Sequence, residues 1–368
     1  MIAVISSYMW GRNILAASKE LQQLKDIKRC GRKRALARFY NVNSILGNDW
    51  AMFYCVLGSR MTGKSYAIAE RVCQLKRKYG DGCKVYWIRI SETSTKNLLA
   101  NKAKKLIDPD LVAKYNLELT TKAGTVYDHG KEFCQVYALS GAAKAKGQAL
   151  YDKDFTGRLV FVLDEFQLEQ GERRTSFDIL YNFISILETA GRTRKDNVEV
   201  WLLGNTLEES SSILKAFEFL PEEFGRFKLR RKRCVIDNLE PTEEYLKDRY
   251  GSMAQILGGD RMSNYTNELI KDKELITKQK LVRPTAIIKF GKPSSMWYTL
   301  WDGCVVRKYR NEALPKESDF CMRPYINSYY SLERKATILQ MYDARALKFQ
   351  NLIDQSYFEG DLASVRKS

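Results

Sequence analysis

The chain has 368 residues, with 61 lysines and arginines against 44 aspartates and glutamates, which gives a formal net charge of +17. This length suffices for two or three domains, and a hydrophobic share of 45% allows a sizeable core. The positive charge favours a polyanionic partner, with nucleic acid as the first candidate. No stretch approaches the roughly 20 apolar residues of a membrane-spanning helix, and the N-terminus lacks signal-peptide features. We therefore expect no membrane association and a cytoplasmic location.

Zinc chemistry and a serine–histidine–aspartate triad are also disfavoured. The eight cysteines are scattered without a Cys-x2-Cys pair, and His129 is the single histidine. The sequence around His129, Tyr-Asp-His-Gly-Lys, predicts the turn of a hairpin spanning residues 125–139.

A glycine-rich loop follows the first strand-like run of the chain. Residues 53–57 are apolar, and residues 66–70 fit the first turns of a helix. Strand, glycine loop and helix form the context of a phosphate-binding loop, whose backbone amides point at a phosphate chain. We expect Lys64 to reach the outer phosphates of ATP and Ser65 to ligate Mg²⁺; the alternative is a plain glycine turn. The predicted nucleotide-binding residues are Gly58, Ser59, Arg60, Met61, Thr62, Gly63, Lys64 and Ser65.

Two acids follow a strand that is predicted to be buried. A second strand is expected at residues 84–90, and the continuous apolar run at 159–163 fits a strand covered on both faces of a parallel sheet. Asp164 and Glu165 come directly after that run. Paired carboxylates there are costly without a cation, so we expect Asp164 to hold Mg²⁺ and Glu165 to polarise the attacking water. The alternative is a solvated strand end.

A helix and another strand complete the predicted ATPase domain. The helix covers residues 176–189 and ends in Gly-Arg-Thr-Arg-Lys, and the strand at 198–203 ends in Gly204 and Asn205. An extra strand between the phosphate loop and the acidic strand, with a glutamate after the aspartate, is typical of the additional-strand catalytic-glutamate branch of P-loop enzymes. The predicted class is therefore α/β with a central, mostly parallel sheet.

The composition changes near residue 221, after which five of the seven prolines occur. The basic run at 228–233 is expected to leave the first domain. We expect an ATPase domain at 1–227, a basic linker and helical lid at 228–275, and a C-terminal domain at 276–368 with short strands at 285–290, 296–301 and 304–309.

Four segments together resemble the DNA-packaging motor ATPases of phi-twenty-nine-like podophages: residues 58–67, 159–166, 191–194 and 203–206. The resemblance implies a homo-oligomeric ring, with five subunits expected, at the portal of a viral procapsid in the host cytoplasm. ATP hydrolysis there drives double-stranded DNA inward, and a structural packaging RNA is a further candidate partner. The C-terminal domain is implied to be a small α+β, ribonuclease-H-like fold without nuclease activity.

The resemblance also implies roles for individual residues. These are contacts to phosphate and Mg²⁺ by Lys64, Ser65 and Asp164, catalysis by Glu165, a polar sensor at Asn205, and an arginine finger at Arg192 or, as second candidate, Arg194.

Two other functions stay open from the sequence. One is a helicase or a terminase large subunit with an active nuclease, although residues 285–290 lack the aspartate that a two-metal nuclease needs on its first strand. The other is a non-enzymatic, basic nucleic-acid-binding protein.

Overall fold

The computed structural model describes most of the chain, in two compact units. The larger unit comprises Gln22–Phe217 and Glu223–Leu269, and the smaller comprises Ile270–Ser368 with Met1–Leu21 and Glu218–Glu222. Within them the described residues are 27–29, 39–141, 154–167, 177–205, 211–221, 223–250, 252, 256, 275–282, 284–289, 296–309, 328–330 and 335–366.

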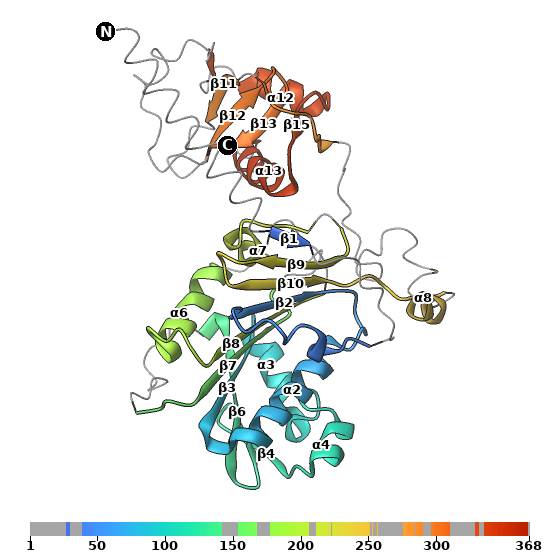
Figure 1. Cartoon of the computed structure of the whole chain (residues 1–368), viewed down its shortest axis with the longest axis vertical. Coiled ribbons are helices and arrows are strands. Elements are labelled where there is room, and N and C mark those ends of the chain that lie inside the picture. The colour runs from blue at the N-terminus through green and yellow to red at the C-terminus, as the bar shows by residue number, and fades with distance from the viewer. Residues whose placement is uncertain are drawn as a thin grey trace. The chain divides into compact units, whose positions relative to one another are not determined.

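A ten-stranded sheet forms the larger unit (Figure 1). The order is β1-β9-β10-β2-β8-β7-β3-β6-β5-β4, and the six strands from β10 to β6 run parallel. The bounds are β1 Ile27–Arg29, β2 Phe53–Leu57, β3 Cys83–Arg89, β4 Leu119–Lys122, β5 Thr125–Asp128, β6 Lys131–Ala138, β7 Arg158–Asp164, β8 Val198–Gly204, β9 Gly225–Leu229 and β10 Cys234–Asn238. The expected hairpin is confirmed, with His129 in the turn between β5 and β6.

The strand inserted between the phosphate-loop strand and the acidic strand is β8. It pairs with β2 on one side and with β7 on the other. In the chain β3 comes between β2 and β7, but in the sheet it lies beyond β7. The extra strand is therefore confirmed, while its identity is not the one that chain order suggests, because crossover connections separate chain order from sheet order.

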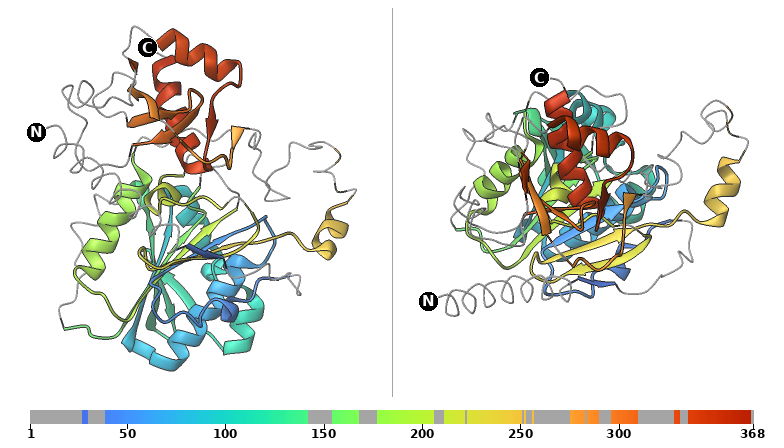
Figure 2. Two further views of the ribbon diagram at one scale, coloured as in Figure 1. Left: turned by 45° about the horizontal axis from the view of Figure 1, so that its top comes forward. Right: turned by 90° about the horizontal axis from the view of Figure 1, so that it is seen from above.

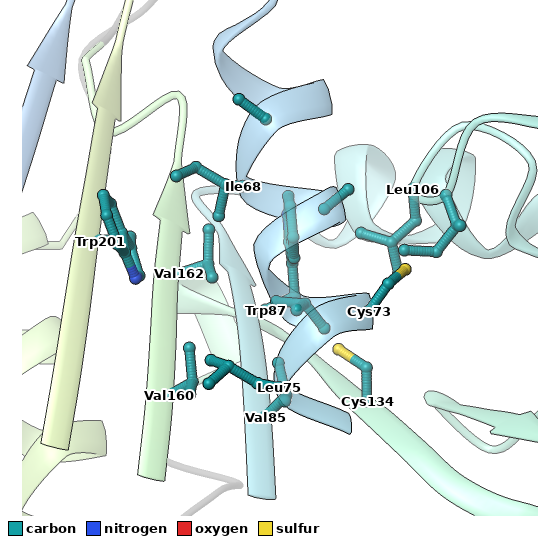
Figure 3. Packing of buried hydrophobic residues seen from close by; sticks show 14 of the residues in the cluster. Ile68, Cys73, Leu75, Val85, Trp87, Leu106, Cys134, Val160, Val162 and Trp201 are labelled. Carbon is teal, nitrogen blue, oxygen red and sulfur yellow. The ribbon is translucent and has the colours of Figure 1, made fainter. Parts of the chain in front are cut away.

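Helices cover both faces of this sheet. Helices α2 (Lys64–Tyr79), α3 (Glu92–Ala103) and α4 (Pro109–Tyr115) lie on one face, and α6 (Ile179–Gly191) lies on the other (Figures 1 and 2). Figure 3 shows side chains of α2 packed against Val160 and Val162 of β7, both fully buried. Burial on both faces explains why β7 is apolar without alternation. Short 3-10 turns at Val42–Ser44, Gly80–Gly82 and Leu139–Gly141 and helix α7 (Ser212–Ala216) complete the core connections.

The expected domain boundary after residue 227 is too early. Strands β9 and β10 form a hairpin in the large sheet, and β10 pairs directly with β2. The basic run at 228–233 is therefore mostly the turn of this hairpin, where charged side chains can stay in water, rather than a segment that leaves the domain. Helix α8 (Glu243–Arg249) follows; most of the rest of the expected linker lies outside the described residues.

The smaller unit contains a five-stranded sheet of order β14-β11-β12-β13-β15. Its elements are β11 Pro284–Lys289, β12 Trp297–Trp301, β13 Val305–Lys308, β14 Ser328–Tyr330, α12 Lys335–Asp343, β15 Lys348–Phe349 and α13 Leu352–Arg366. Strands β11, β12 and β13 are antiparallel, and β14 runs parallel to β11. This second sheet agrees with the expected nuclease-like α+β domain, and the sequence of β11 contains no acid. Among the described helices, none is both long and apolar enough to span a membrane.

Candidate active site

The strand, glycine loop and helix follow one another as predicted, with the loop between the end of β2 and the start of α2. Gly63 caps α2 with φ of +81°, a left-handed conformation that favours glycine. At the other end of the loop, a Cβ on Gly58 would lie only 3.0 Å from Leu239 Cδ1. The backbone conformation thus favours glycine at position 63, and close packing of the Leu239 side chain favours it at position 58.

The residues between these glycines divide into buried and exposed ones. Ser59 and Thr62 are buried, and the Thr62 hydroxyl donates to the Ser59 carbonyl at 2.9 Å. Arg60 and Met61 are exposed at the outside of the loop. Arg60 and Met61 thus face solvent, whereas Ser59 and Thr62 are joined by a hydrogen bond inside the loop.

Lys64 is held inside the loop. Its ammonium group donates to the carbonyls of Gly58 at 2.8 Å and Ser59 at 2.7 Å. Burial lowers the pKa of Lys64 to about 8, although the nearby carboxylates of Asp164 and Glu165 act in the opposite direction. A cation that is largely desolvated and set among the loop carbonyls is well placed to exchange them for phosphate oxygens.

Asp164 and Ser65 meet at the carboxyl end of β7. The Ser65 hydroxyl donates to Asp164 Oδ1 at 3.3 Å, across 99 residues of sequence. Asp164 is buried, and this burial raises the pKa of its carboxyl group. A hydroxyl and a carboxylate are the oxygen ligands that Mg²⁺ accepts, so these two residues fit the predicted metal site.

Arg89, the last residue of β3, was not among the predicted site residues. Its guanidinium group lies 2.9 Å from Asp164 Oδ2 and also pairs with Glu165. Because β3 lies beside β7, their carboxyl ends bring this cation to both acids. The only sequence signal was one charged residue near the end of an apolar, β-rich run.

Glu165 lies between Arg89 and the polar end of β8. Its backbone is left-handed, with φ of +56°, and its side chain is 45% exposed. The Asn205 amide is 3.5 Å from Glu165 Oε1. The predicted catalytic acid and the predicted sensor are therefore brought together, on the ends of neighbouring strands.

The two candidate finger arginines lie away from this site. Helix α6 ends at Gly191, close to Leu159 near the start of β7 and to Phe161 at its middle. Arg194 donates to the carbonyls of Thr156 and Gly157, which precede β7, so this end of α6 lies toward the start of β7 and not at its carboxyl end, where Asp164 lies. Neither is brought to the loop of its own chain.

Arg194 is tied to its own chain. It donates to the carbonyls of Thr156 at 2.9 Å and Gly157 at 2.6 Å, and it stacks over the Phe155 ring. Arg192 is the C-cap of α6 and is exposed.

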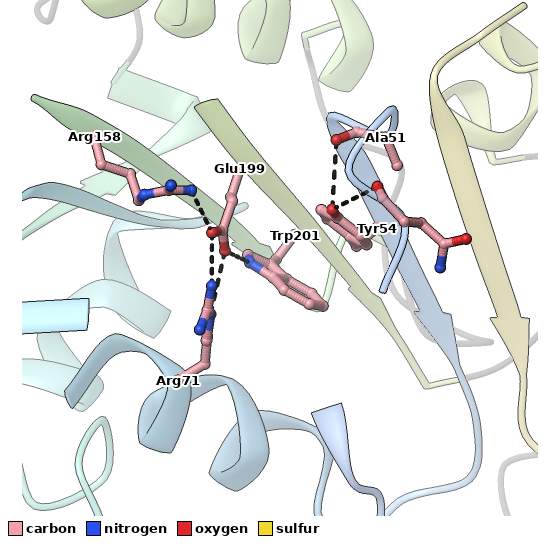
Figure 4. Close-up of polar contacts among 7 residues, drawn as sticks. Ala51, Tyr54, Arg71, Arg158, Glu199 and Trp201 are labelled. Carbon is pink, nitrogen blue, oxygen red and sulfur yellow. Dashed lines mark hydrogen bonds and ion pairs between the residues drawn. The ribbon is translucent and has the colours of Figure 1, made fainter. Parts of the chain in front are cut away.

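A buried charge cluster fixes α2 to the sheet (Figure 4). Glu199 of β8 accepts from Arg71 of α2 at 2.9 Å and from Arg158 of β7 at 2.8 Å, and the Trp201 indole donates to it at 3.2 Å. Arg71 thus bonds the helix that starts at the glycine loop to β8, and the same Glu199 carboxylate links β8 to β7 through Arg158.

Comparison with solved structures identifies the fold. It matches gp11 of the Phi-28 DNA packaging motor over 88% of this chain and 98% of that one, with a TM-score of 0.57 and 14% identity. It matches a chain of the bacteriophage Phi-29 viral genome packaging motor assembly over 90% and 100%, with a TM-score of 0.58 and 17% identity. The resemblance found in the sequence and the predicted fold class are confirmed at the level of fold. Neither a protein-family model nor a curated protein matches the sequence.

Proposed function

We propose that this chain is an ATPase that drives double-stranded DNA into a viral procapsid. The observation that carries the proposal is the position of Glu165, at the carboxyl end of β7 beside Asp164 and within 3.5 Å of Asn205. A loop alone supports phosphate binding, whereas an exposed carboxylate next to the phosphate-binding residues supports activation of a water molecule.

Each residue has a role that follows from its position. The ammonium of Lys64 and the amides at the start of α2 bind the phosphates. Ser65 and Asp164 would hold Mg²⁺, which supplies charge neutralisation when bound. Glu165 orients and deprotonates the attacking water after leaving Arg89, and Asn205 donates to Glu165 or to the outer phosphate. In this structure the Glu165 carboxylate forms an ion pair with the guanidinium group of Arg89.

The proposal extends to a homo-oligomeric ring. An arginine finger stabilises charge on the transferring phosphoryl group. Arg192 follows the end of α6, which lies beside Leu159 and Phe161 of β7 rather than at the carboxyl end of that strand, so it would serve a neighbour's ATP. We propose a ring of five subunits at the procapsid portal in the host cytoplasm, with a packaging RNA as a candidate partner.

Duplex DNA is the proposed polyanion because the chain carries a net charge of +17 and because the structures with this fold are named as packaging motors. The nuclease alternative lacks support, since β11 supplies no acid for a two-metal site.

The reaction is tested by the Glu165→Gln variant. It should bind ATP as tightly as the wild type, because the amide keeps the shape of the side chain, but should hydrolyse it at least about 100-fold more slowly. The exposed Glu188→Gln variant on α6 is the control and should hydrolyse normally. ATP hydrolysis by Glu165→Gln at the wild-type rate would contradict the proposed catalytic role of Glu165.

A further inference from the structure

An aromatic side chain rests on the phosphate-binding loop without belonging to the core. A Cβ at Gly63 would lie 3.1 Å from Phe39 Cβ and 3.2 Å from its Cδ1, so Phe39 packs directly on the last glycine of the loop. Phe39 is nevertheless 56% exposed. Val42 and Ile45, in the same segment, are buried in the main core, so the segment has core positions that Phe39 does not use.

The backbone that carries Phe39 is anchored to the loop and to the sheet. The Tyr40 amide donates to the Thr62 carbonyl at 2.8 Å, and the Tyr40 hydroxyl donates to Asp237 Oδ2 at 3.0 Å. Asp237, on β10, also binds Arg226 of β9, which in turn donates to the Ser44 hydroxyl at 2.8 Å. The hydrogen bonds of Tyr40 to Thr62 and Asp237 thus hold the backbone next to Phe39 beside the loop.

A side chain lies against each of the two glycines that end the loop, and the two side chains differ in exposure. At Gly58 the Leu239 side chain lies in close contact, and β10 runs alongside β2. At Gly63, where α2 begins, the neighbouring group is the exposed Phe39. A ribose and base attached to phosphates at the start of α2 would therefore meet an exposed aromatic ring at Phe39.

We propose that Phe39 is the platform on which the nucleobase of the bound nucleoside triphosphate stacks, with Tyr40, Asp237 and Arg226 holding that platform in place. The inference rests on the proposed function, because it assumes that the loop binds a nucleotide. Stacking on an aromatic ring tolerates different bases, since every base has a π face. The contact therefore adds affinity for nucleosides over bare polyphosphate and favours the larger purine ring.

Competition with a fluorescent ATP analogue labelled on the ribose separates base from phosphate recognition. Unlabelled ATP and inorganic tripolyphosphate displace the analogue from the full chain. The Phe39→Ala variant should bind ATP about tenfold more weakly and tripolyphosphate as well as the wild type, and Phe39→Trp should restore ATP binding. Tyr181→Ala, which removes a comparably exposed ring from α6, should change neither affinity.

The Phe39→Trp variant gives a second readout. Stacking should quench the added indole fluorescence on addition of ATP, relative to wild-type protein, and tripolyphosphate should not. If Phe39→Ala weakens the binding of ATP and of tripolyphosphate equally, Phe39 only supports the loop conformation at Gly63, and the stacking proposal is wrong. An unchanged affinity for ATP would also overturn the proposal. Either result leaves the proposed function standing, whereas a wild-type chain that binds neither ligand would overturn both.

Discussion

The guanidinium group of Arg89 lies 2.9 Å from Asp164 Oδ2 and also pairs with Glu165, so one cation serves both acids of the site. Arg89 and Asp164 are both largely buried, and the arginine opposes the effect of burial on the pKa of Asp164. The arrangement has a measurable consequence for stability.

The Arg89→Ala variant should lower the free energy of unfolding at pH 7 by about 3–5 kcal/mol, because it leaves a buried carboxylate without its cation. The pKa of Asp164 is already raised by burial and should rise further in the variant. A raised pKa costs stability only where the carboxyl is ionised, so the deficit should shrink as pH falls through that pKa. Urea titrations at several pH values measure this, with Arg89→Lys as the control that keeps a charge. A deficit that is independent of pH would contradict the assignment.

Nucleotide affinity should depend on pH through Lys64. Burial lowers the pKa of the free Lys64 to about 8, and bound phosphate should raise it because it stabilises the charged ammonium. ATP affinity is therefore constant below pH 8 and falls by up to tenfold per pH unit above it. Calorimetry from pH 7 to 9.5 in buffers of different ionisation enthalpy should also detect proton uptake on binding. In Lys64→Arg, whose guanidinium does not titrate, the slope should disappear; a wild-type affinity that is flat across this range would refute the prediction.

The cluster around Glu199 should stabilise the fold without taking part in the chemistry. Glu199→Gln weakens its bonds to Arg71 and Arg158 in a buried setting, so we expect a loss of about 1–3 kcal/mol. Unfolding in urea measures the loss, and Glu188→Gln, at an exposed position of α6, should stay within about 0.5 kcal/mol of the wild type. Equal free energies of unfolding for the two variants would show that the cluster around Glu199 does not stabilise the fold.

The two arginines after α6 should have separable effects. Arg194→Ala removes donors to two backbone carbonyls and should cost about 1 kcal/mol of stability. Arg192→Ala should leave stability within about 0.5 kcal/mol but reduce hydrolysis by the assembled ring roughly 1,000-fold.

Mixing of subunits distinguishes a finger that acts across the interface. Arg192→Ala subunits should regain hydrolysis when combined with Glu165→Gln subunits, because each supplies what the other lacks. If only Arg194→Ala mixtures recover, the two roles must be exchanged.

Much of the site could be predicted because its chemistry is contiguous in the chain. The loop at residues 58–65 and the acids at 164–165 each lie at the end of an apolar run, and parallel strands bring such ends together. The fold class follows from the same alternation of strands and helices.

Other parts depend on contacts that a local pattern does not contain. Arg89 became a site residue only because β3 pairs with β7. The run at 228–233 has the charge of a linker, yet β10 pairs with β2, since strand pairing over about 180 residues leaves no local signal. Phe39 likewise acquires its place from one long-range contact, with Gly63.

The central claim is that hydrolysis at this loop moves DNA. The most direct measurement mixes the chain with empty procapsids, duplex DNA, Mg²⁺ and ATP, and assays for DNA that has become resistant to nuclease. Wild-type protein should protect DNA in proportion to the ATP consumed, and Glu165→Gln should bind ATP and protect none. Protection that is independent of ATP, or no hydrolysis in the complete mixture, would contradict the account.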